Sequence, residues 1–349
     1  MILTDRTFRK VSRFHIEEKR RKRVDISLII FAHLAAIVLA LFIDFIVGDP
    51  EHWPHPVRFF GAQISWCDRL FNRGKHRKLK GITPPLFLFF WTVIASGIFI
   101  YFCYHLSYIF GIVIEGLLIS TTIARTSLEK AALEVHEPLH AENIDGARAS
   151  VGMIVGRDTD TLSKGEVTRA TVETVAENVS DGITAPLFFA LFGGAPLALF
   201  YRAVNTCDSM VGYKNKQYME FGYCSARLDD LLNLIPSRTT AFALVLGYIH
   251  KSKYTLKEVL SIVKRDARKH PSPNSGFLES AVAGLLGVRL GGVNTYKGVV
   301  SHRAHMGNPD QELKASMIKE TIQIMNRGVL YYSVFILIGG GLFVALTWS

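Results

Sequence analysis

Acidic and basic side chains recur along one predicted helix face in the segment from Glu166 to Gly182. Intervals of three and four residues place side chains on the same face of a helix, and this spacing joins Glu166, Arg169, Glu173 and Glu177. For the first three, a solvated helix surface is as good an interpretation as a functional face. Glu173 is nonetheless a candidate metal ligand, because Mg²⁺ prefers carboxylate oxygens.

The end of this helix is the more specific signal. Glu177, Asn178, Ser180 and Asp181 come directly before a glycine and an apolar run. Carboxylates at the entrance to a membrane suit Mg²⁺ that is also bound to phosphate oxygens, and a carboxylate can also act as a general acid or base. We therefore predict Glu177 and Asp181 as catalytic residues, and Asn178 and Ser180 as substrate ligands.

A second polar block, YRAVNTCDSMVGYKNK, continues out of an apolar run. Arg202 and Asn205 share a helical face, with Asp208 beside them. Ionisable residues at membrane depth are costly, and they usually line a cavity or pair internally, so an internal Arg–Asp pair is the structural alternative. The functional interpretation is an anion-binding wall with Asp208 as a catalytic residue. Arg202 and Asn205 would then bind substrate, and Lys214 would offer a point charge to phosphate.

Two pairs of aspartates are further candidates for a metal site. Asp158 and Asp160 belong to the sequence RDTD, and Asp229 and Asp230 precede an apolar run. Acidic residues at a helix start also stabilise the helix dipole. A purely structural role for Asp229 and Asp230 therefore stays open.

Three other segments contribute predicted substrate ligands. Arg227 and Asn233 each lie about one helical turn from a member of the second aspartate pair. Asn274 or Ser275 can cap a helix that follows several basic residues; such a helix start binds anions, although it is equally an ordinary capped helix. Arg58 lies in the proline-stiffened loop GDPEHWPHPVRFFG, whose alternative role is to rest at the membrane interface.

Other classes of site are weakly represented or absent from the sequence. The pairs His52–His55 and His302–His305 have H-x-x-H spacing without a cysteine partner, so a zinc site is disfavoured. The sequence contains no P-loop, dinucleotide-binding glycine motif, zinc-protease motif or nucleophile elbow. The four cysteines form no CxxC pair and are interpreted as reduced and structural.

Helices in a membrane must position these residues, because the chain has long apolar runs and a bilayer crossing takes ~20 residues. The second run is too long for one span and predicts either two helices or one span and a long buried helix. The third run contains GGAP and predicts a kink, and the fourth is short. The fold class is therefore all-α: a polytopic integral membrane protein with about five or six membrane helices and polar helical loops. The runs are Ser27–Val47, Pro84–Thr122, Ala185–Val204, Ile235–Ile249 and Gly328–Trp348.

Composition agrees with a membrane location. The 349 residues carry a formal net charge of +10, and 49% are hydrophobic. Residues 1–26 are predicted to be a basic extension, flexible or surface-bound, that favours the cytoplasmic side, and residues 27–349 a single membrane-embedded catalytic domain. The first apolar run lacks a signal-peptide cleavage site. Net charge alone would suit a nucleic-acid binder, but no nucleic-acid module occurs, so no such partner is predicted.

Five uncommon strings, taken together and in this order, resemble the cobalamin-biosynthesis CobD/CbiB family. The resemblance covers the chain from about residue 28 to the C-terminus. It implies an adenosylcobinamide-phosphate synthase, which joins (R)-1-amino-2-propanol phosphate, or a related amino-alcohol phosphate, to a propionate carboxylate of adenosylcobyric acid. The strings are GDPEHWPHPVRFFG, VGRDTDTLS, ATVETVAENVSDGITAPLFFALFGGAPLALFYRAVNTCDSMVGYKN, FGYCSARLDDLLNLIPSR and KHPSPNSGFLESAVAGLLGVRLGG.

The implied reaction sets the cofactors and partners to expect. A carboxylate resists attack by an amine because its oxygen is a poor leaving group, so we expect ATP to activate it through an acyl phosphate. Mg²⁺ and cationic side chains would screen the phosphates. The expected enzyme is an acid–amine ligase of the cell membrane, with the lipid bilayer, the corrinoid, the amino-alcohol phosphate and other cobalamin-pathway enzymes as partners. The alternative is a membrane corrinoid transporter or scaffold serving a separate ligase.

Overall fold

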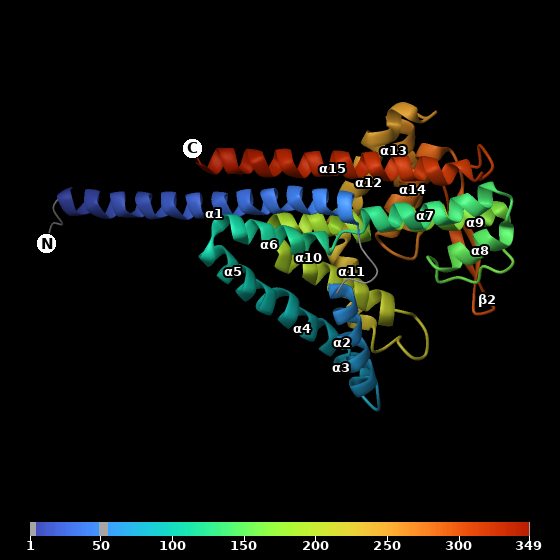
Figure 1. The fold of residues 1–349 in the computed structure, drawn as a ribbon, viewed down its shortest axis with the longest axis horizontal. Coiled ribbons are helices and arrows are strands. Elements are labelled where there is room, and N and C mark those ends of the chain that lie inside the picture. The colour runs from blue at the N-terminus through green and yellow to red at the C-terminus, as the bar shows by residue number, and fades with distance from the viewer. Residues whose placement is uncertain (1–4, 49–54, 349) are drawn as a thin grey trace.

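The computed structural model describes the backbone of residues 5–48 and 55–348 and the side chains of residues 26–48 and 55–347. This part is helical apart from one two-stranded antiparallel sheet (Figure 1). Long apolar helices form a membrane half, and short helices and the sheet form a polar half at the end away from both termini (Figure 1).

The chain passes between the two halves more than once, because membrane segments occur near its start, in its middle and at α15. The first elements are α1 (Asp5–Val47), α2 (Pro56–Phe71), α3 (Arg77–Lys80), α4 (Thr83–Phe89), a π-helical turn (Phe90–Ala95), α5 (Ser96–Leu106), α6 (Tyr108–Ser120), α7 (Arg125–His140) and α8 (Ile144–Gly152). The later elements are α9 (Lys164–Val179), a second π-helical turn (Ser180–Thr184), α10 (Ala185–Val211), α11 (Tyr223–Leu232), α12 (Leu234–Tyr248), α13 (Leu256–Asp266), α14 (Ser275–Leu286), β1 (Leu290–Tyr296), β2 (Val299–Met306) and α15 (Ser316–Trp348).

The predicted membrane fold is confirmed. The run Pro84–Thr122 forms two helices, the first of the two predicted alternatives, because the chain turns at Ser107 between α5 and α6. The short run Ile235–Ile249 becomes α12, which packs along α15. Within the described residues, five helical segments are long and apolar enough to cross a membrane: Ile26–Val47, Arg77–Leu106, Tyr108–His140, Lys164–Val211 and Ser316–Thr347.

Hydrogen bonds between helices mark the two ends of the membrane half. At one end the hydroxyls of Ser27 and Thr347 lie 2.6 Å apart. At the other end the Thr126 hydroxyl donates to the Asp44 carbonyl at 2.7 Å. A helix rises about 26 Å between residues 27 and 44, close to the ~30 Å of bilayer hydrocarbon. Both termini lie toward the first end, and the polar half begins at the second (Figure 1).

The α10 segment is a helical hairpin and not one continuous helix. Gly193 and Gly194 have non-helical backbone angles, and Gly194 lies at φ 58° and ψ −151°, where only glycine is at ease. The rings of Phe189 and Tyr201 stack with centroids 5.2 Å apart, whereas twelve residues of straight helix would separate them by about 18 Å. The predicted kink at GGAP is therefore confirmed, and it reverses the chain within the membrane half.

A buried polar cluster holds the tip of this hairpin. Glu115 of α6 accepts hydrogen bonds from the Ala195 backbone N–H (3.1 Å) and the Tyr104 hydroxyl (2.5 Å). The imidazole of His33 in α1 lies 3.6 Å from the same carboxylate, which is only 1% exposed. The Ala195 N–H belongs to the first turn of the returning helix, so the carboxylate lies at the positive end of that helix. Irregular backbone is tolerated at membrane depth when protein surrounds it.

The sheet is an addition to the predicted helical architecture. Its strands pair antiparallel through a tight turn, where Asp158 accepts hydrogen bonds from the backbone N–H groups of Lys297 (2.9 Å) and Gly298 (2.8 Å). Arg169 of α9 donates to the backbone carbonyls of Gly291 and Val293 in β1. Side chains more than 100 residues away along the chain thus hold the sheet, and they fix β2 beside α14.

The basic N-terminal segment forms the first part of α1, which begins at Asp5. We expected a flexible or surface-bound tail here. Lys, Arg and Glu are good helix formers, and the segment continues without a break into the apolar span that starts at Ile26. The division of the chain into an extension (residues 1–26) and a catalytic domain (residues 27–349) stays a prediction.

Candidate active site

An acidic cavity of about 270 Å³ lies at the boundary between the membrane half and the polar half. The backbone N–H of Ala124, just beyond α6, donates to the Gly182 carbonyl at 2.9 Å. Because Thr126 bonds to Asp44 one turn further on, this part of the cavity is level with the end of the apolar span of α1. Nine of the predicted site residues line the cavity: Glu177, Asp181, Asp208, Lys214, Asp229, Asp230, Asn233, Asn274 and Ser275.

Asn205, on the returning arm of the α10 hairpin, joins two of the acidic residues. Its side-chain nitrogen lies 3.4 Å from a carboxylate oxygen of Asp181 and 3.3 Å from one of Asp229. Asn233 donates to the other oxygen of Asp229 (3.1 Å) and accepts from the buried Tyr201 hydroxyl (2.8 Å). Three distant segments of the chain therefore converge, and their amides fix the orientation of the carboxylates.

Burial and like charge act on the acids that α11 contributes. The pKa of Asp229 is raised to about 7, first by burial and then by the charge of Asp208. Burial also raises the pKa of Asp230, although Arg227 lowers it in part. Carboxylates in this position are stabilised by a proton or a cation. The cavity thus favours ligands that bring positive charge.

Glu177 and Ser275 bring α9 and α14 together at the cavity. The Ser275 hydroxyl donates to a carboxylate oxygen of Glu177 at 2.7 Å. The neighbouring Asn274 is engaged in packing: its amide nitrogen donates to the Asp230 carbonyl (2.8 Å), and its oxygen accepts from Arg238 (3.0 Å). Asn274 therefore positions the junction of α11 and α12, while Ser275 orients an acid of the cavity.

The acidic side chains fit a Mg²⁺ ion that is shared with phosphate. Within the described side chains, no group of three or more His, Cys, Asp or Glu residues is arranged to hold a metal ion. Mg²⁺ often takes only one or two carboxylates and completes its shell with phosphate oxygens and water. Asp181, Asp208 and Asp229 offer the hard oxygen donors that such an ion prefers.

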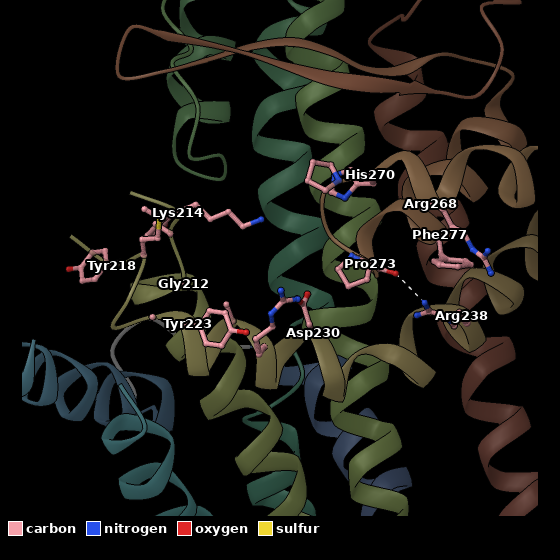
Figure 2. A pocket seen from close by; sticks show the side chains of 16 residues that line it. Gly212, Lys214, Tyr218, Tyr223, Asp230, Arg238, Arg268, His270, Pro273 and Phe277 are labelled. Carbon is pink, nitrogen blue, oxygen red and sulfur yellow. Dashed lines mark hydrogen bonds and ion pairs between the residues drawn. The ribbon is translucent and has the colours of Figure 1, made fainter. Parts of the chain in front are cut away.

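A larger cavity of about 620 Å³ opens from the acidic one. Tyr223, Phe277, Pro273 and Arg238 line it, and Figure 2 shows them around the mouth. The Arg238 guanidinium lies over the Phe277 ring, 4.2 Å from its centroid. Flat apolar surfaces with a few fixed polar groups suit a broad, amphipathic ligand. The two cavities share Gly212, Lys214, Ala226, Asp230, His270 and Pro271.

Three predicted metal ligands do not line either cavity. Glu173 is buried in an ion pair with Arg157 at 2.5 Å, Asp158 holds the turn of the sheet, and Asp160 is exposed. Glu173 shares a helix face with Glu177, as the spacing predicts. Glu173, however, lies one helical turn before Glu177, where the helix packs against Arg157 and the sheet.

Three predicted substrate ligands also lie away from the cavities. Arg58 is exposed in the first turn of α2. The Asn178 amide donates to the Thr174 carbonyl of its own helix at 2.9 Å, and Ser180 is fully buried in the second π-helical turn. His52, one of the disfavoured zinc candidates, falls outside the described residues.

Two predicted arginines lie close to the acids. A guanidinium nitrogen of Arg202 lies 3.4 Å from the Asp181 carbonyl, so it supports the backbone that carries this acid. Arg227 lines the larger cavity and faces Asp230 at 3.7 Å. Both are therefore placed to act near an anionic substrate, and their role in binding stays a prediction.

Sequence reasoning missed two ionisable residues of the acidic cavity, His270 and Arg303. His270 precedes the helix start that was predicted to bind anions, so closeness to Asn274 was a usable signal. Arg303 lies on β2, in a sheet that was not predicted. No local motif marks it, and only the fold brings it opposite the acids.

The comparisons with known proteins agree with one another. A family model described as CobD/Cbib protein matches residues 37–325. Cobalamin biosynthesis protein CobD of Halalkalibacterium halodurans is 47% identical over 318 residues, which is 91% of this chain and 100% of that protein. The CobD protein of Leptospira interrogans is 41% identical over 307 residues (87% and 97%), and CbiB of Salmonella typhimurium is 39% identical over 304 residues (84% and 92%).

No solved structure matches the chain. The family model nevertheless spans most of the sequence, and these relatives align with it over nearly their whole length. The matched region contains every residue of the acidic cavity named above. The chain therefore belongs to the CobD/CbiB family.

Proposed function

We propose that this protein is an adenosylcobinamide-phosphate synthase, a multi-pass membrane ligase that joins an amino-alcohol phosphate to a propionate carboxylate of adenosylcobyric acid. Its relatives are named for cobalamin biosynthesis, and membership of their family assigns this protein to that pathway. Amide formation and ATP go beyond those names and are proposed from the reaction that the family resemblance implies, and Mg²⁺ is proposed from that reaction together with the carboxylates of the site.

The observation that carries the proposal is the junction of the two cavities at the membrane boundary. The larger cavity offers Tyr223, Phe277 and Pro273 to the broad face of a corrinoid. The acidic cavity, reached through Lys214 and Asp230, offers carboxylates to a magnesium nucleotide and to an ammonium group. A corrinoid is large and amphipathic, so a site beside the lipid surface accommodates its apolar and polar parts together.

The proposed reaction has two steps, and residues of the acidic cavity have separate roles in it. ATP phosphorylates the propionate carboxylate to an acyl phosphate and leaves as ADP; the amine then attacks the acyl carbon, and phosphate departs. Mg²⁺ held by one or two of the carboxylates of Asp181, Asp208 and Asp229, and by phosphate oxygens, would neutralise charge on the phosphates. Glu177 takes a proton from the ammonium so that the amine becomes a nucleophile. The hydrogen bond from Ser275 keeps that carboxylate in position.

The test is turnover by the purified protein alone. Wild-type protein in detergent is given adenosylcobyric acid, the amino-alcohol phosphate, ATP and Mg²⁺, and both the corrinoid amide and ADP are measured. We expect Glu177→Gln and Asp208→Asn each to lower kcat by at least ~100-fold, because general-base and electrostatic contributions have this size. Both variants should still reach the membrane.

Matched controls are available on exposed helices. Glu134 and Asp145 carry the same functional groups with side chains 61% and 87% exposed, so Glu134→Gln and Asp145→Asn should leave kcat unchanged. Wild-type protein that binds corrinoid but forms no amide would defeat the ligase proposal in favour of a transporter or scaffold. Unchanged turnover in Glu177→Gln or Asp208→Asn would remove that residue from the site.

A further inference from the structure

The acidic cavity is also lined by two nitrogen-bearing side chains, the guanidinium of Arg303 and the imidazole of His270. Arg303 lies on β2, and His270 lies in the segment before α14. Figure 2 shows His270 across the mouth from Lys214, with Asp230 below them. The cavity therefore combines carboxylates, among them Asp208 of α10 and Asp229 of α11, with the nitrogen-bearing side chains of His270 and Arg303.

Arg303 has no carboxylate within ion-pair distance among the residues that the structure describes. One guanidinium nitrogen donates to the Tyr296 hydroxyl (2.9 Å), and the other approaches Nε2 of His270 (3.5 Å). The side chain is half-buried. Burial works to lower its pKa, but Tyr296, Glu279 and other acids raise it overall, so the guanidinium stays charged. Protein cations in such surroundings are usually paired, which leaves this one available to an anionic ligand.

The groups behind Arg303 do not supply the missing charge. Nδ1 of His270 accepts from the Ser272 backbone N–H (3.1 Å), so in the neutral ring the proton is on Nε2. That nitrogen faces Glu279, 3.4 Å away and 1% exposed. Burial is the main cause that raises the pKa of Glu279, and burial together with Arg303 lowers the pKa of His270. Both groups thus favour their neutral forms, and the positive charge of Arg303 is not cancelled.

We infer that Arg303, with His270 beside it, is a subsite for the phosphate monoester of the amino-alcohol substrate. This inference rests on the proposed function and extends it. Nucleotide phosphates beside the carboxylates of the cavity need a metal ion, because both groups are negatively charged. A phosphate at Arg303 can instead be bound directly by the planar guanidinium. Glu177 lines the same cavity and interacts electrostatically with His270 and Arg303, so the ammonium end of the same molecule would reach the proposed base.

The test compares Arg303→Gln with wild type using each substrate in turn. We expect KM for the amino-alcohol phosphate to rise by roughly 10- to 100-fold, the loss typical of a charged hydrogen-bonded contact, with KM for ATP unchanged. The preference for the phosphorylated amine over unphosphorylated 1-amino-2-propanol should fall by the same factor. Arg303→Lys, which keeps a point charge, should restore part of the preference. An unchanged KM for the amino-alcohol phosphate, or a rise confined to ATP, would overturn the assignment.

Two control variants separate recognition from folding. Tyr296→Phe removes the hydroxyl that Arg303 contacts and keeps the charge, and Arg289→Gln removes an exposed arginine that borders a different cavity. Both should keep the wild-type KM for the amino-alcohol phosphate. If Tyr296→Phe shifted this KM as strongly as Arg303→Gln, the effect would be structural and the subsite would be rejected.

A binding measurement without ATP keeps this inference apart from the proposed reaction. Calorimetry with (R)-1-amino-2-propanol phosphate should show binding to the wild type in detergent and weaker binding to Arg303→Gln. If the wild type binds this probe but forms no amide, the proposed reaction fails and the subsite stands. If amide forms while both proteins bind the probe equally, the subsite fails and the reaction stands.

Discussion

Asp229 shows how burial controls the chemistry of a single side chain in the acidic cavity. Its pKa in the folded protein is about 7, against ~3.9 for an aspartate in an unfolded chain. The folded protein therefore binds this proton more tightly than the unfolded chain does. The contribution of Asp229 to stability is fully present below pH ~4 and is lost as the pH rises toward 7.

The first prediction follows from this sign. Asparagine cannot ionise, so Asp229→Asn should gain stability relative to wild type as the pH rises from 5 to 8. The measurement is Tm in detergent at both pH values, without Mg²⁺ or nucleotide. The exposed variant Asp145→Asn should differ from wild type by the same amount at pH 5 and pH 8. A Tm difference for Asp229→Asn that does not grow with pH contradicts the burial argument.

The residue scale also shows what helical spacing can and cannot predict. Spacing correctly placed Glu173 and Glu177 on one face, and only Glu177 reaches the cavity. What a face meets depends on packing with distant segments, and here Glu173 meets Arg157. Acids beside apolar runs were the better signal, because Asp181, Asp208 and Asp229 line the cavity.

At the scale of elements, the α10 hairpin brings two of these acids to the same place. Asp181 lies in the π-helical turn that leads into the outgoing arm, Asp208 lies on the returning arm, and both residues line the cavity. The reversal depends on Gly194, whose φ is positive. A Cβ at that position would overlap the Glu115 carboxylate. The glycine is thus required twice, once for backbone freedom and once for space.

The second prediction is that Gly194→Ala destabilises the protein by at least ~2 kcal/mol, the size of a strained left-handed residue with an added steric conflict. Lower Tm and reduced accumulation in the membrane would be measured. Gly97 is the matched control: it faces the returning arm, and an added Cβ would lie 3.9 Å from Pro196, an ordinary contact. Gly97→Ala should be neutral or slightly stabilising, because alanine favours helix. Equal Tm for both variants would show that the tip tolerates a side chain.

The apolar runs made the helices predictable, whereas the sheet left no comparable local signal. Runs of about twenty apolar residues have one stable solution in lipid, a helix. In β2, by contrast, the burial pattern alternates only weakly because most of its side chains are exposed. The sheet is held by Arg169, Glu173 and Asp158 from far along the chain. Contacts of that kind are not visible in a local pattern, and Arg303 was missed with them.

For the whole molecule, the hairpin changes the count of crossings. Five described segments are long enough to span, but Lys164–Val211 doubles back at Gly193 and Gly194. The other four segments cross the membrane. The start of the first span, at Ser27, and the end of the last, at Thr347, therefore lie on the same side. The acidic cavity lies on the opposite side, because it is level with Asp44, whereas Ser27 lies at the other end of the same span.

The third prediction tests this arrangement by cysteine labelling. Ser107 joins α5 to α6 at the end with the termini, and Asn215 lies in the exposed loop beside the cavity. Cys67, Cys103 and Cys207 are buried, so the Cys224→Ser variant should show little labelling of its native cysteines. In sealed vesicles of one orientation, an impermeant maleimide should label only one of Ser107→Cys and Asn215→Cys until the membrane is opened. Labelling of both from the same side would contradict the four crossings.

The turn at Gly193 and Gly194 also determines from which side of the membrane the substrates reach the site. Because the hairpin goes back the way it came, its polar arms open onto a single aqueous compartment. The proposed reaction would therefore draw ATP, corrinoid and amine from that one compartment and would release the amide into it. Such a reaction carries no substrate or charge across the bilayer, so its free energy does not depend on the membrane potential.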